Sequence, residues 1–448
     1  MSDPRNSSKS GATVANPELV RDVQETNARY LSAAEREIPK GYKQTEVGVI
    51  PEDWEIFQLA ELGKFKNGIN KNCEAFGHGS PFVNLMDVFG VSKISSTDSL
   101  GLVETNNAEQ QTYNLMKGDV IFIRSSVKPS GVGLTAVVEQ NFQKTVYSGF
   151  LIRFRDNGVI NQKFKYHCFY EEGFRNRLIG ASTVSANTNI NQDNLKRLFL
   201  ALPPTKAEQE AIAVALSDAD ALIEALEQLI AKKRQLKQGA MQELLTGKRR
   251  LPGFSGEWKL KPLGEFIEKI VGGGTPSRSN PDYWGDEIPW VTVKDFATFN
   301  PRYSQESISK AGLQNSASHL IPRETLITST RMGLGKAVIY DIDVAINQDL
   351  KALFPKNLLL THYLYFWFQY YGRLIEELGS GSTVKGISLS ELKKIAFLLP
   401  SLPEQTAIAQ ILTDMDAEIT GLESKLTKAR AVKQGMMQQL LTGKIRLT

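Results

Sequence analysis

One stretch of about fifty residues occurs twice in this 448-residue chain. Residues 204–251 and residues 400–447 align without a gap, and 27 of the 48 positions are identical. Low-complexity bias does not explain the match, because it includes the whole of Leu-Leu-Thr-Gly-Lys at 244–248 and 440–444. An internal repeat of this length requires that one structural unit be built twice.

Each copy predicts a long amphipathic helix. No proline falls between Lys206 and Thr246, and Gly247 and Gly443 follow the copies as natural C-terminal stops. Apolar residues step by four and three positions, which is the spacing of a heptad seam that Lys233 interrupts in the first copy. Because two related stripes occur in one chain, we expect the helices to pack on each other. The predicted pairing residues are Ile212, Leu216, Ile223, Leu226, Ile230, Ile408, Leu412, Met415, Ile419, Leu422 and Leu426.

Composition limits the functional classes. Lysine and arginine number 53 against 49 acidic residues, a net charge of +4 that permits nucleic-acid binding without requiring it. No apolar run approaches the ~18 residues of a membrane span, and the polar N-terminus lacks the apolar core of a signal peptide. Two cysteines outside any Cys-x-x-Cys pair, with four histidines, favour a reducing cytoplasm and no zinc site.

The repeat divides the chain into alternating domains and helices. We expect an N-terminal extension at 1–40 that is partly disordered, with one amphipathic helix at 17–37. A first domain at 41–203, a helix at 204–250, a second domain at 251–399 and a helix at 400–448 follow. The two domains begin alike, around Trp54 and Trp258, but their interiors differ far more than the helices do.

Short β-rich runs dominate both domains. Residues 118–123 and 134–138 predict paired strands in the first domain, and residues 324–328 and 336–340 predict a pair in the second. We therefore expect an α+β chain in which two mixed α/β domains alternate with two long helices in a pseudo-two-fold repeat. Since the frame residues repeat while the interiors diverge, two unlike readers on one scaffold would suit an asymmetric, two-part target.

The candidate binding residues are basic side chains beside hydroxyls and glycines. An arginine can donate two hydrogen bonds to guanine, while hydroxyls and backbone amides bind phosphates. A solvated surface arginine is the alternative for any single residue. The candidates in the first domain are Arg124, Ser125, Ser126, Lys128, Ser182 and Thr183; those in the second are Thr275, Ser277, Arg278, Lys294, Thr330, Arg331, Lys336, Ser382, Thr383 and Lys385.

Three short motifs resemble catalytic sites but lack essential residues. Asn280-Pro-Asp-Tyr283 lacks the second proline of an adenine methyltransferase loop, and no glycine-rich cofactor loop follows a strand. Residues 333–336 lack the Ser or Thr of a phosphate-binding loop, and the Glu-x-Lys at 391–393 lacks an upstream acidic residue. We therefore predict no catalytic residues in this chain.

Taken together, these segments resemble the specificity subunit of type I restriction–modification systems. The duplicated helices carry the resemblance, with the segments Gly41–Trp54 and Gly273–Trp290. It implies a non-catalytic, cytoplasmic subunit with two target recognition domains that bind double-stranded DNA. The helices would form an antiparallel coiled coil that docks two methyltransferase subunits, and a translocating restriction subunit would join them. S-adenosylmethionine, ATP and magnesium would belong to those partners and none to this chain. Residues 1–40 extend beyond the family pattern.

The resemblance also implies a mechanism. Each domain would bind a half-site in the major groove, and the docked methyltransferase would flip an adenine out of the duplex. A helix of forty residues is roughly 60 Å long, which exceeds the ~34 Å of one DNA turn. Two other classes stay open: a fused methyltransferase or nuclease fragment, and a coiled-coil scaffold that binds only protein.

Overall fold

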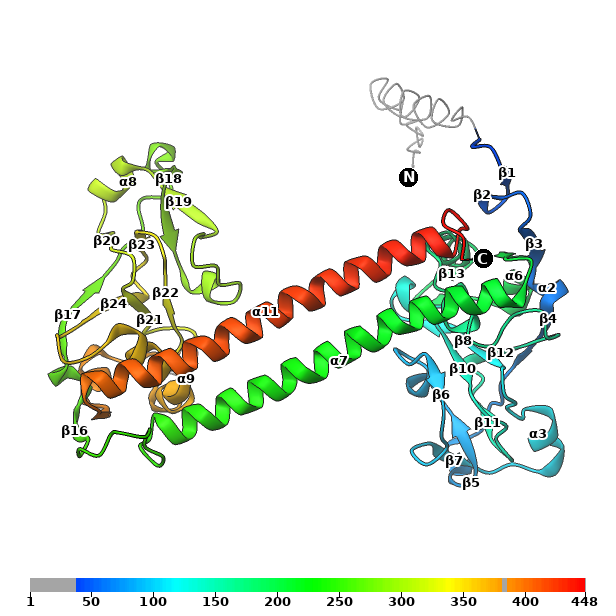
Figure 1. The fold of residues 1–448 in the computed structure, drawn as a ribbon, viewed down its shortest axis with the longest axis horizontal. Coiled ribbons are helices and arrows are strands. Elements are labelled where there is room, and N and C mark those ends of the chain that lie inside the picture. The colour runs from blue at the N-terminus through cyan, green and yellow to red at the C-terminus, as the bar shows by residue number, and fades with distance from the viewer. Residues whose placement is uncertain (1–37, 381–384, 448) are drawn as a thin grey trace, which may run out of the picture. The chain divides into compact units, whose positions relative to one another are not determined.

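A computed structural model describes residues 38–380 and 385–447 (Figure 1). The helix expected at 17–37 lies outside these residues. The chain divides into two compact units. Unit 1 combines the residues up to Leu222 with those from Ala429 onward, and unit 2 comprises Ile223–Lys428. Each long helix therefore contributes residues to both units.

The repeat forms two long helices. Helix α7 spans Lys206–Leu244 and helix α11 spans Leu402–Leu440, with 39 residues each (green and orange-red in Figure 1). Three residues beyond each helix, Gly247 and Gly443 have φ of 68° and 70°, a conformation that favours glycine. The predicted helices and their glycine stops are confirmed.

Domain 1, the β-rich part of unit 1, contains a five-stranded sheet in the order β4-β12-β8-β10-β6. Two three-stranded sheets accompany it, in the orders β11-β5-β7 and β13-β14-β9. The predicted strand pair is confirmed as β8 against β10, with Phe122 opposite Thr135. The strands of unit 1 are β1 Tyr42–Thr45, β2 Gly48–Pro51, β3 Glu55–Gln58, β4 Gly63–Asn67, β5 Phe76–Val83, β6 Lys93–Ile94, β7 Gly101–Val103, β8 Val120–Ile123, β9 Ser125–Ser126, β10 Thr135–Val138, β11 Val146–Tyr147, β12 Leu151–Asp156, β13 Thr183–Val184, β14 Thr188–Asn189 and β15 Phe199–Leu202.

Short helices cover the sheets of domain 1. All four residues of β8 are buried, as expected for a central strand with apolar side chains on both faces. Phe164, Phe169 and Phe174 from the helical segments pack into the same core. The helices are α2 Leu59–Leu62, α3 Asn107–Thr112, α4 Lys165–Cys168, α5 Glu172–Gly180 and α6 Gln192–Lys196.

Domain 2, the β-rich part of unit 2, contains two four-stranded sheets, β17-β24-β21-β22 and β19-β18-β23-β20. The predicted pair is confirmed as β21 against β22. Its strands are β16 Lys259–Pro262, β17 Ile267–Gly272, β18 Trp284–Val291, β19 Glu306–Ile308, β20 Leu320–Ile321, β21 Leu326–Ser329, β22 Ala337–Ile339, β23 Val344–Ile346, β24 Leu350–Pro355 and β25 Ala396–Leu399; its helices are α8 Lys310–Gln314, α9 Thr361–Leu378 and α10 Leu389–Lys394. Both domains are mixed α/β, as the sequence predicts.

The core of each unit contains the start of one repeat and the end of the other. In unit 1, Leu440 and Leu441 pack in the same core as Leu216 and Trp54. In unit 2, Leu244 and Leu245 share the core with Ile408 and Leu412. The start of one long helix thus meets the end of the other, so the two helices run antiparallel within each unit.

Ion pairs repeat this antiparallel arrangement in both units. In unit 1, Lys433 Nζ lies 2.5 Å from Asp220 Oδ1. In unit 2, Lys237 Nζ lies 2.6 Å from Asp416 Oδ1. Since Lys237 and Lys433 occupy matching positions of the repeat, as do Asp220 and Asp416, the two pairs are the same interaction formed twice.

The predicted pairing residues lie on the inward faces of the helices, and none is exposed. Lys233, which interrupts the apolar seam, bonds to Glu418 at 2.6 Å within unit 2. The buried members are Ile212, Leu216, Ile230, Ile408, Leu412 and Ile419; the half-buried ones are Ile223, Leu226, Met415, Leu422 and Leu426.

His167 joins domain 1 to the long helices within unit 1. Its Nε2 lies 3.1 Å from the Ser217 hydroxyl of α7. Burial lowers the pKa of His167 to about 4; Lys433 and Lys93 lower it further and Asp220 opposes them. At neutral pH the imidazole is therefore uncharged. Phe366 occupies the matching position in unit 2. Asn161 lies six residues before His167, and Leu360 lies six residues before Phe366. Their amides donate to Gln209 and Gln405, which are matching residues of the two long helices.

The first prediction concerns acid stability. Between pH 6.5 and about 4 the unfolded chain binds the His167 proton and the folded chain does not, so stability is full above pH 6.5 and falls as the pH drops. The loss at pH 4 amounts to about 3 kcal/mol. We expect His167→Phe, which copies unit 2, to reduce the acid loss of unfolding free energy by about this amount. An unchanged acid profile in urea titrations would contradict the assignment.

The second prediction concerns the helix contacts. Leu216 and Leu412 are fully buried in the two cores. Truncating a buried leucine costs about 2–5 kcal/mol, so Leu216→Ala and Leu412→Ala should each lower the unfolding midpoint in denaturant. Leu222→Ala, at a site 55% exposed on the same helix as Leu216, is the control and should change the midpoint little. Equal effects of all three substitutions would show that the buried leucines do not stabilise the two units.

Candidate nucleic-acid interface

In domain 1 the backbone holds the Arg124 loop on both sides. The Arg124 amide donates to the Phe150 carbonyl at 2.9 Å, and the Arg124 carbonyl accepts from the Ile190 amide at 2.9 Å. The next two residues form β9, which pairs with β14, and β14 pairs in turn with β13. The small sheet therefore brings the predicted residues Ser125, Ser126 and Thr183 together beside Arg124.

The other candidates of domain 1 differ in their freedom to bind. Lys128 is exposed at the start of the turn that follows β9. The Ser182 hydroxyl donates to the Leu178 carbonyl at 2.9 Å and so helps to end helix α5. Lys128 is available to a ligand, whereas Ser182 has a structural role.

Arg175 of helix α5 donates hydrogen bonds to the turn that follows β9. Its Nη2 donates to the carbonyls of Ser130 and Val132 at 3.0 and 2.8 Å. Burial lowers the pKa of the Arg175 guanidinium below its ordinary value, and its Nη1 is buried without a hydrogen-bond partner. Burying this charged guanidinium costs more free energy than burying a neutral donor would.

In domain 2 the corresponding loop carries more charge. The Thr330 amide and hydroxyl donate to the Asp349 carbonyl at 3.0 and 3.1 Å. Arg331 pairs with Gly386, next to the exposed Lys385. The Arg331 side chain is 63% exposed, and its Nη1 lies 4.0 Å from Asp349 Oδ1. The structure thus brings Thr330, Arg331 and Lys385 together.

The two loops are offset by one residue. Ile123 is paired with Leu151, and Ser329 with Leu350. The following residues, Arg124 and Thr330, both donate to the residue before those partners. Arg124 therefore matches Thr330, and Arg331 matches Ser125. Successive residues of an extended chain point to opposite faces, so the two arginines, which look comparable in sequence, occupy unlike positions of the shared frame.

The glycine-rich segment of domain 2 is held by side chains. Arg278 forms two hydrogen bonds to Glu306, at 2.7 and 2.8 Å, and its guanidinium carbon lies 3.8 Å from the centre of the Trp284 ring. The Arg278 hydrogen bonds lower the pKa of the Glu306 carboxyl below its usual range. The Thr275 hydroxyl bonds to Gln348 at 2.6 Å. Two of the five N–H donors of Arg278 are thus engaged within the domain, and its side chain is 56% exposed.

The remaining candidates of domain 2 are exposed or outside the described residues. Lys294 and Lys336 are exposed, and the segments that carry them are adjacent, since both border Gly333. The Ser277 and Ser279 hydroxyls lie 2.8 Å apart. Ser382 and Thr383 lie in the segment 381–384, outside the described residues.

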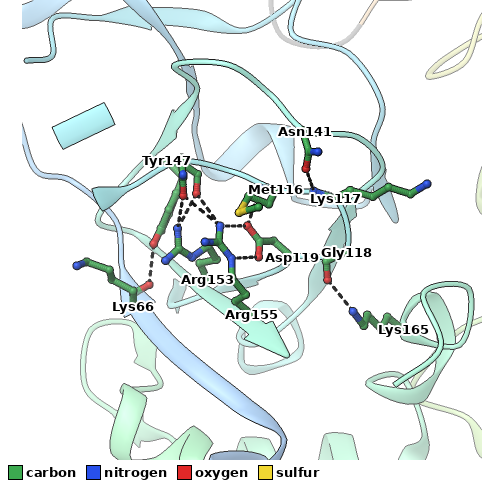
Figure 2. A network of polar contacts seen from close by, with 11 residues as sticks. Lys66, Met116, Lys117, Gly118, Asp119, Asn141, Tyr147, Arg153, Arg155 and Lys165 are labelled. Atoms are coloured by element: carbon green, nitrogen blue, oxygen red, sulfur yellow. Dashed lines mark hydrogen bonds and ion pairs between the residues drawn. The ribbon is translucent and has the colours of Figure 1, made fainter. Parts of the chain in front are cut away.

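A separate polar network in domain 1 engages two arginines of β12 within the domain (Figure 2). Arg155 forms two hydrogen bonds to Asp119, at 2.7 and 2.6 Å, which raise the pKa of its guanidinium. Arg153 donates to the Asn114 carbonyl at 2.5 Å, and the Tyr147 hydroxyl donates to the Lys66 carbonyl at 3.1 Å. These cations fix the sheet and are not free for phosphate.

The short motifs have structural roles. The Asn280 side chain caps a turn by accepting from the Asp282 amide at 3.1 Å. Glu391 caps helix α10 by accepting from the Ser388 amide at 2.9 Å. Within 38–380 and 385–447, no three histidine, cysteine, aspartate or glutamate side chains group as metal ligands. No helix in this part of the chain is long and apolar enough to cross a membrane.

Sequence reasoning missed the residues that differ most at the shared positions. Phe150 of domain 1 and Asp349 of domain 2 occupy the same place, next to Arg124 and Thr330. Val127 and Val184 are also strongly exposed near the Arg124 loop. An exposed valine in a loop gives no distinctive pattern, and only the strand register reveals that Phe150 and Asp349 correspond.

The family model for the type I restriction modification DNA specificity domain matches residues 51–236 and 255–429. The chain belongs to this family. It is the specificity subunit of a type I restriction–modification system, with two DNA specificity domains in tandem. The predicted family and its DNA specificity function are confirmed.

Related specificity subunits match most or part of the chain. A protein of Methanocaldococcus jannaschii, named as the type I restriction enzyme MjaX specificity subunit, is 29% identical over 91% of this chain and 97% of its own length. The Escherichia coli EcoR124I/EcoR124II specificity subunit is 28% identical over 40% of this chain and 46% of its own length. The crystal structure of the S subunit from M. genitalium has the same fold, with a TM-score of 0.55 and 16% identity over 86% of this chain and 96% of that one.

The third prediction tests the support beneath the Arg124 loop of this specificity subunit. Arg175→Met removes the donors to Ser130 and Val132, so the turn should open more often. We expect faster amide hydrogen exchange at Gly131 and Val132, whose amides bond within the turn. Arg373→Met, at a side chain 91% exposed in domain 2, should leave this exchange unchanged. Identical exchange in both variants would show that Arg175 does not hold the turn.

Proposed function

We propose that this specificity subunit is non-catalytic and reads an asymmetric, two-part DNA target, one half through each domain. The observation that supports this proposal is that the two domains share the same pairing of strands but differ at the matching loop positions. Arg124, Ser125 and Phe150 in domain 1 correspond to Thr330, Arg331 and Asp349 in domain 2. Domains with identical loops would suit a symmetric target, whereas these loops suit two unlike half-sites.

The exposed basic side chains supply the contacts to DNA. Arg331 is the main candidate for a base contact, because its guanidinium is exposed and only loosely tied to Asp349. A guanidinium can form two hydrogen bonds to guanine in the major groove, whereas an exposed lysine such as Lys128 or Lys385 suits a phosphate. Neutralising each phosphate releases counterions, so part of the affinity should depend on salt.

The long helices would set the distance between the half-sites. We propose that α7 and α11 form a continuous antiparallel coiled coil, which the matched Lys433–Asp220 and Lys237–Asp416 pairs support. Thirty-nine residues per helix give a rod about 58 Å long, greater than one ~34 Å turn of DNA.

The partners of this chain would supply the chemistry. We expect the helices to dock two methyltransferase subunits, with restriction subunits completing the complex. S-adenosylmethionine, ATP and magnesium would bind those subunits and not this one. The observation in favour is that related chains carry the name of specificity subunits of restriction enzymes.

The fourth prediction tests the division of the target. Arg331→Ala should cost ~1–3 kcal/mol and relax the sequence preference in one half-site if the arginine binds a guanine. Arg124→Ala should affect the other half only. Binding of the assembled methyltransferase complex to duplex libraries, randomised in one half-site at a time, measures both effects.

The matched control is Arg373→Ala, because this arginine is the most exposed of those in the ion pairs of domain 2 and lies on α9. It should change neither preference. Weaker binding that is even across all sequences, with a salt dependence reduced by about one ion, would assign Arg331 to a phosphate. Equal relaxation of both half-sites by either variant would contradict the proposed division.

A further inference from the structure

Domain 1 exposes large apolar side chains around its recognition loop. Val127 is 80% exposed, Val184 75%, Phe150 59% and Phe89 47%. Single exposed apolar residues are ordinary, but apolar side chains gathered at one place of a soluble protein mark an interaction site. Their position beside Arg124 and the exposed Lys128 makes this surface continuous with the proposed DNA interface.

The backbone places these side chains next to the polar readers. Phe150 lies opposite Arg124, whose amide bonds to its carbonyl. Val184 is in register with Thr188, which is in register with Ser126. Residues opposite one another across neighbouring strands share a face, so Val184 and Ser126 point to the same side. Val127 follows Ser126 just beyond the end of β9, where the alternation of the strand no longer sets the direction of a side chain, and it is strongly exposed.

Gly131 lies against this face of the small sheet. An ideal Cβ on Gly131 would lie 2.3 Å from the Ser126 hydroxyl oxygen and 3.1 Å from the nearest atom of the Phe89 ring. The Ser126 side chain and the Phe89 ring thus both pack on Gly131, on the side that Val184 also faces. Any larger residue at 131 would displace them.

Domain 2 has different chemistry at the matching positions. Asp349 takes the place of Phe150, and Arg331 takes the place of Ser125. Both residues are charged, and the exposed Lys385 adjoins them. Met332, next to Arg331, is 52% exposed but stands beside these charged groups. The cluster of four exposed apolar side chains is therefore found in domain 1 and does not belong to the frame that the two domains share.

Major-groove edges offer one apolar group, the C5-methyl of thymine, beside donors and acceptors. We propose that domain 1 recognises its half-site partly by packing Val127 and Val184, beside Arg124, against thymine C5-methyl groups, with Lys128 contacting the adjacent phosphates. This inference rests on the proposed function. Domain 2, in which the exposed Arg331 takes the place of Ser125, would read its half through charged groups instead.

The fifth prediction uses uracil, which lacks only that methyl group and keeps the base pair. Thymines of one half-site at a time are replaced by uracil in a cognate duplex, and binding of the assembled methyltransferase complex is measured. In the domain 1 half-site we expect about fourfold weaker binding for each contacted thymine, the factor for one buried methyl group.

A double variant ties the effect to these residues. Val127→Ser with Val184→Ser changes two strongly exposed side chains, so folding should be retained, as thermal unfolding would verify. In this variant the ratio of binding to thymine and uracil duplexes should fall to about one. Leu260→Ser, at a site 68% exposed on β16 of unit 2, is the control and should keep the ratio of the unmodified chain.

Three results would overturn the inference. Uracil could leave binding unchanged in both half-sites, the sensitivity could persist in the double variant, or the domain 1 half-site could contain no A·T pair. All three occur with sequence-specific binding intact. Loss of sequence-specific binding by the unmodified complex on any duplex would instead overturn the proposed function, and this inference with it.

Discussion

Two buried carboxylates hold the fold together. Glu208 and Glu404, in the first turns of the long helices, are 3% and 1% exposed. A buried charge needs a partner, and each receives two hydrogen bonds from an arginine beyond the end of the other long helix: Glu208 from Arg446 and Glu404 from Arg250. Arg446 also binds Asp53. Because removing one partner of such a pair costs about 3–5 kcal/mol, each unit is complete only when the other helix end is docked.

The contacts at the helix ends lie apart from the proposed DNA-binding surface. The ion pairs, the helix ends and the stacked Trp54 and Trp258 recur in both units, so the scaffold is built twice from the same contacts. The Arg124 and Arg331 loops lie on strand ends away from these contacts, where a change of side chain costs little stability. Recognition can therefore differ between the domains while the frame stays the same. The contrast between Phe150 and Asp349 at one shared position illustrates this freedom.

Much of the scaffold was predictable because repetition and periodicity are visible in sequence. The helices, the strand pairs and the family followed from residues 204–251, their second copy and a few short motifs. The site was less accessible. The alignment of Arg124 with Arg331 misses the one-residue offset, since strand register depends on partners far along the chain. Whether Arg278 faces DNA or Glu306 depends on packing that no local pattern encodes. The individual DNA contacts remain predictions.

A methylation map of the genome tests the two-reader account most directly. It would compare host strains with and without this chain, at single-base resolution. The account predicts one adenine-methylated motif that disappears with the chain and consists of two unlike half-sites separated by unspecified bases. A palindromic motif, or a single contiguous one, would contradict the claim that two different domains each read their own half of the target.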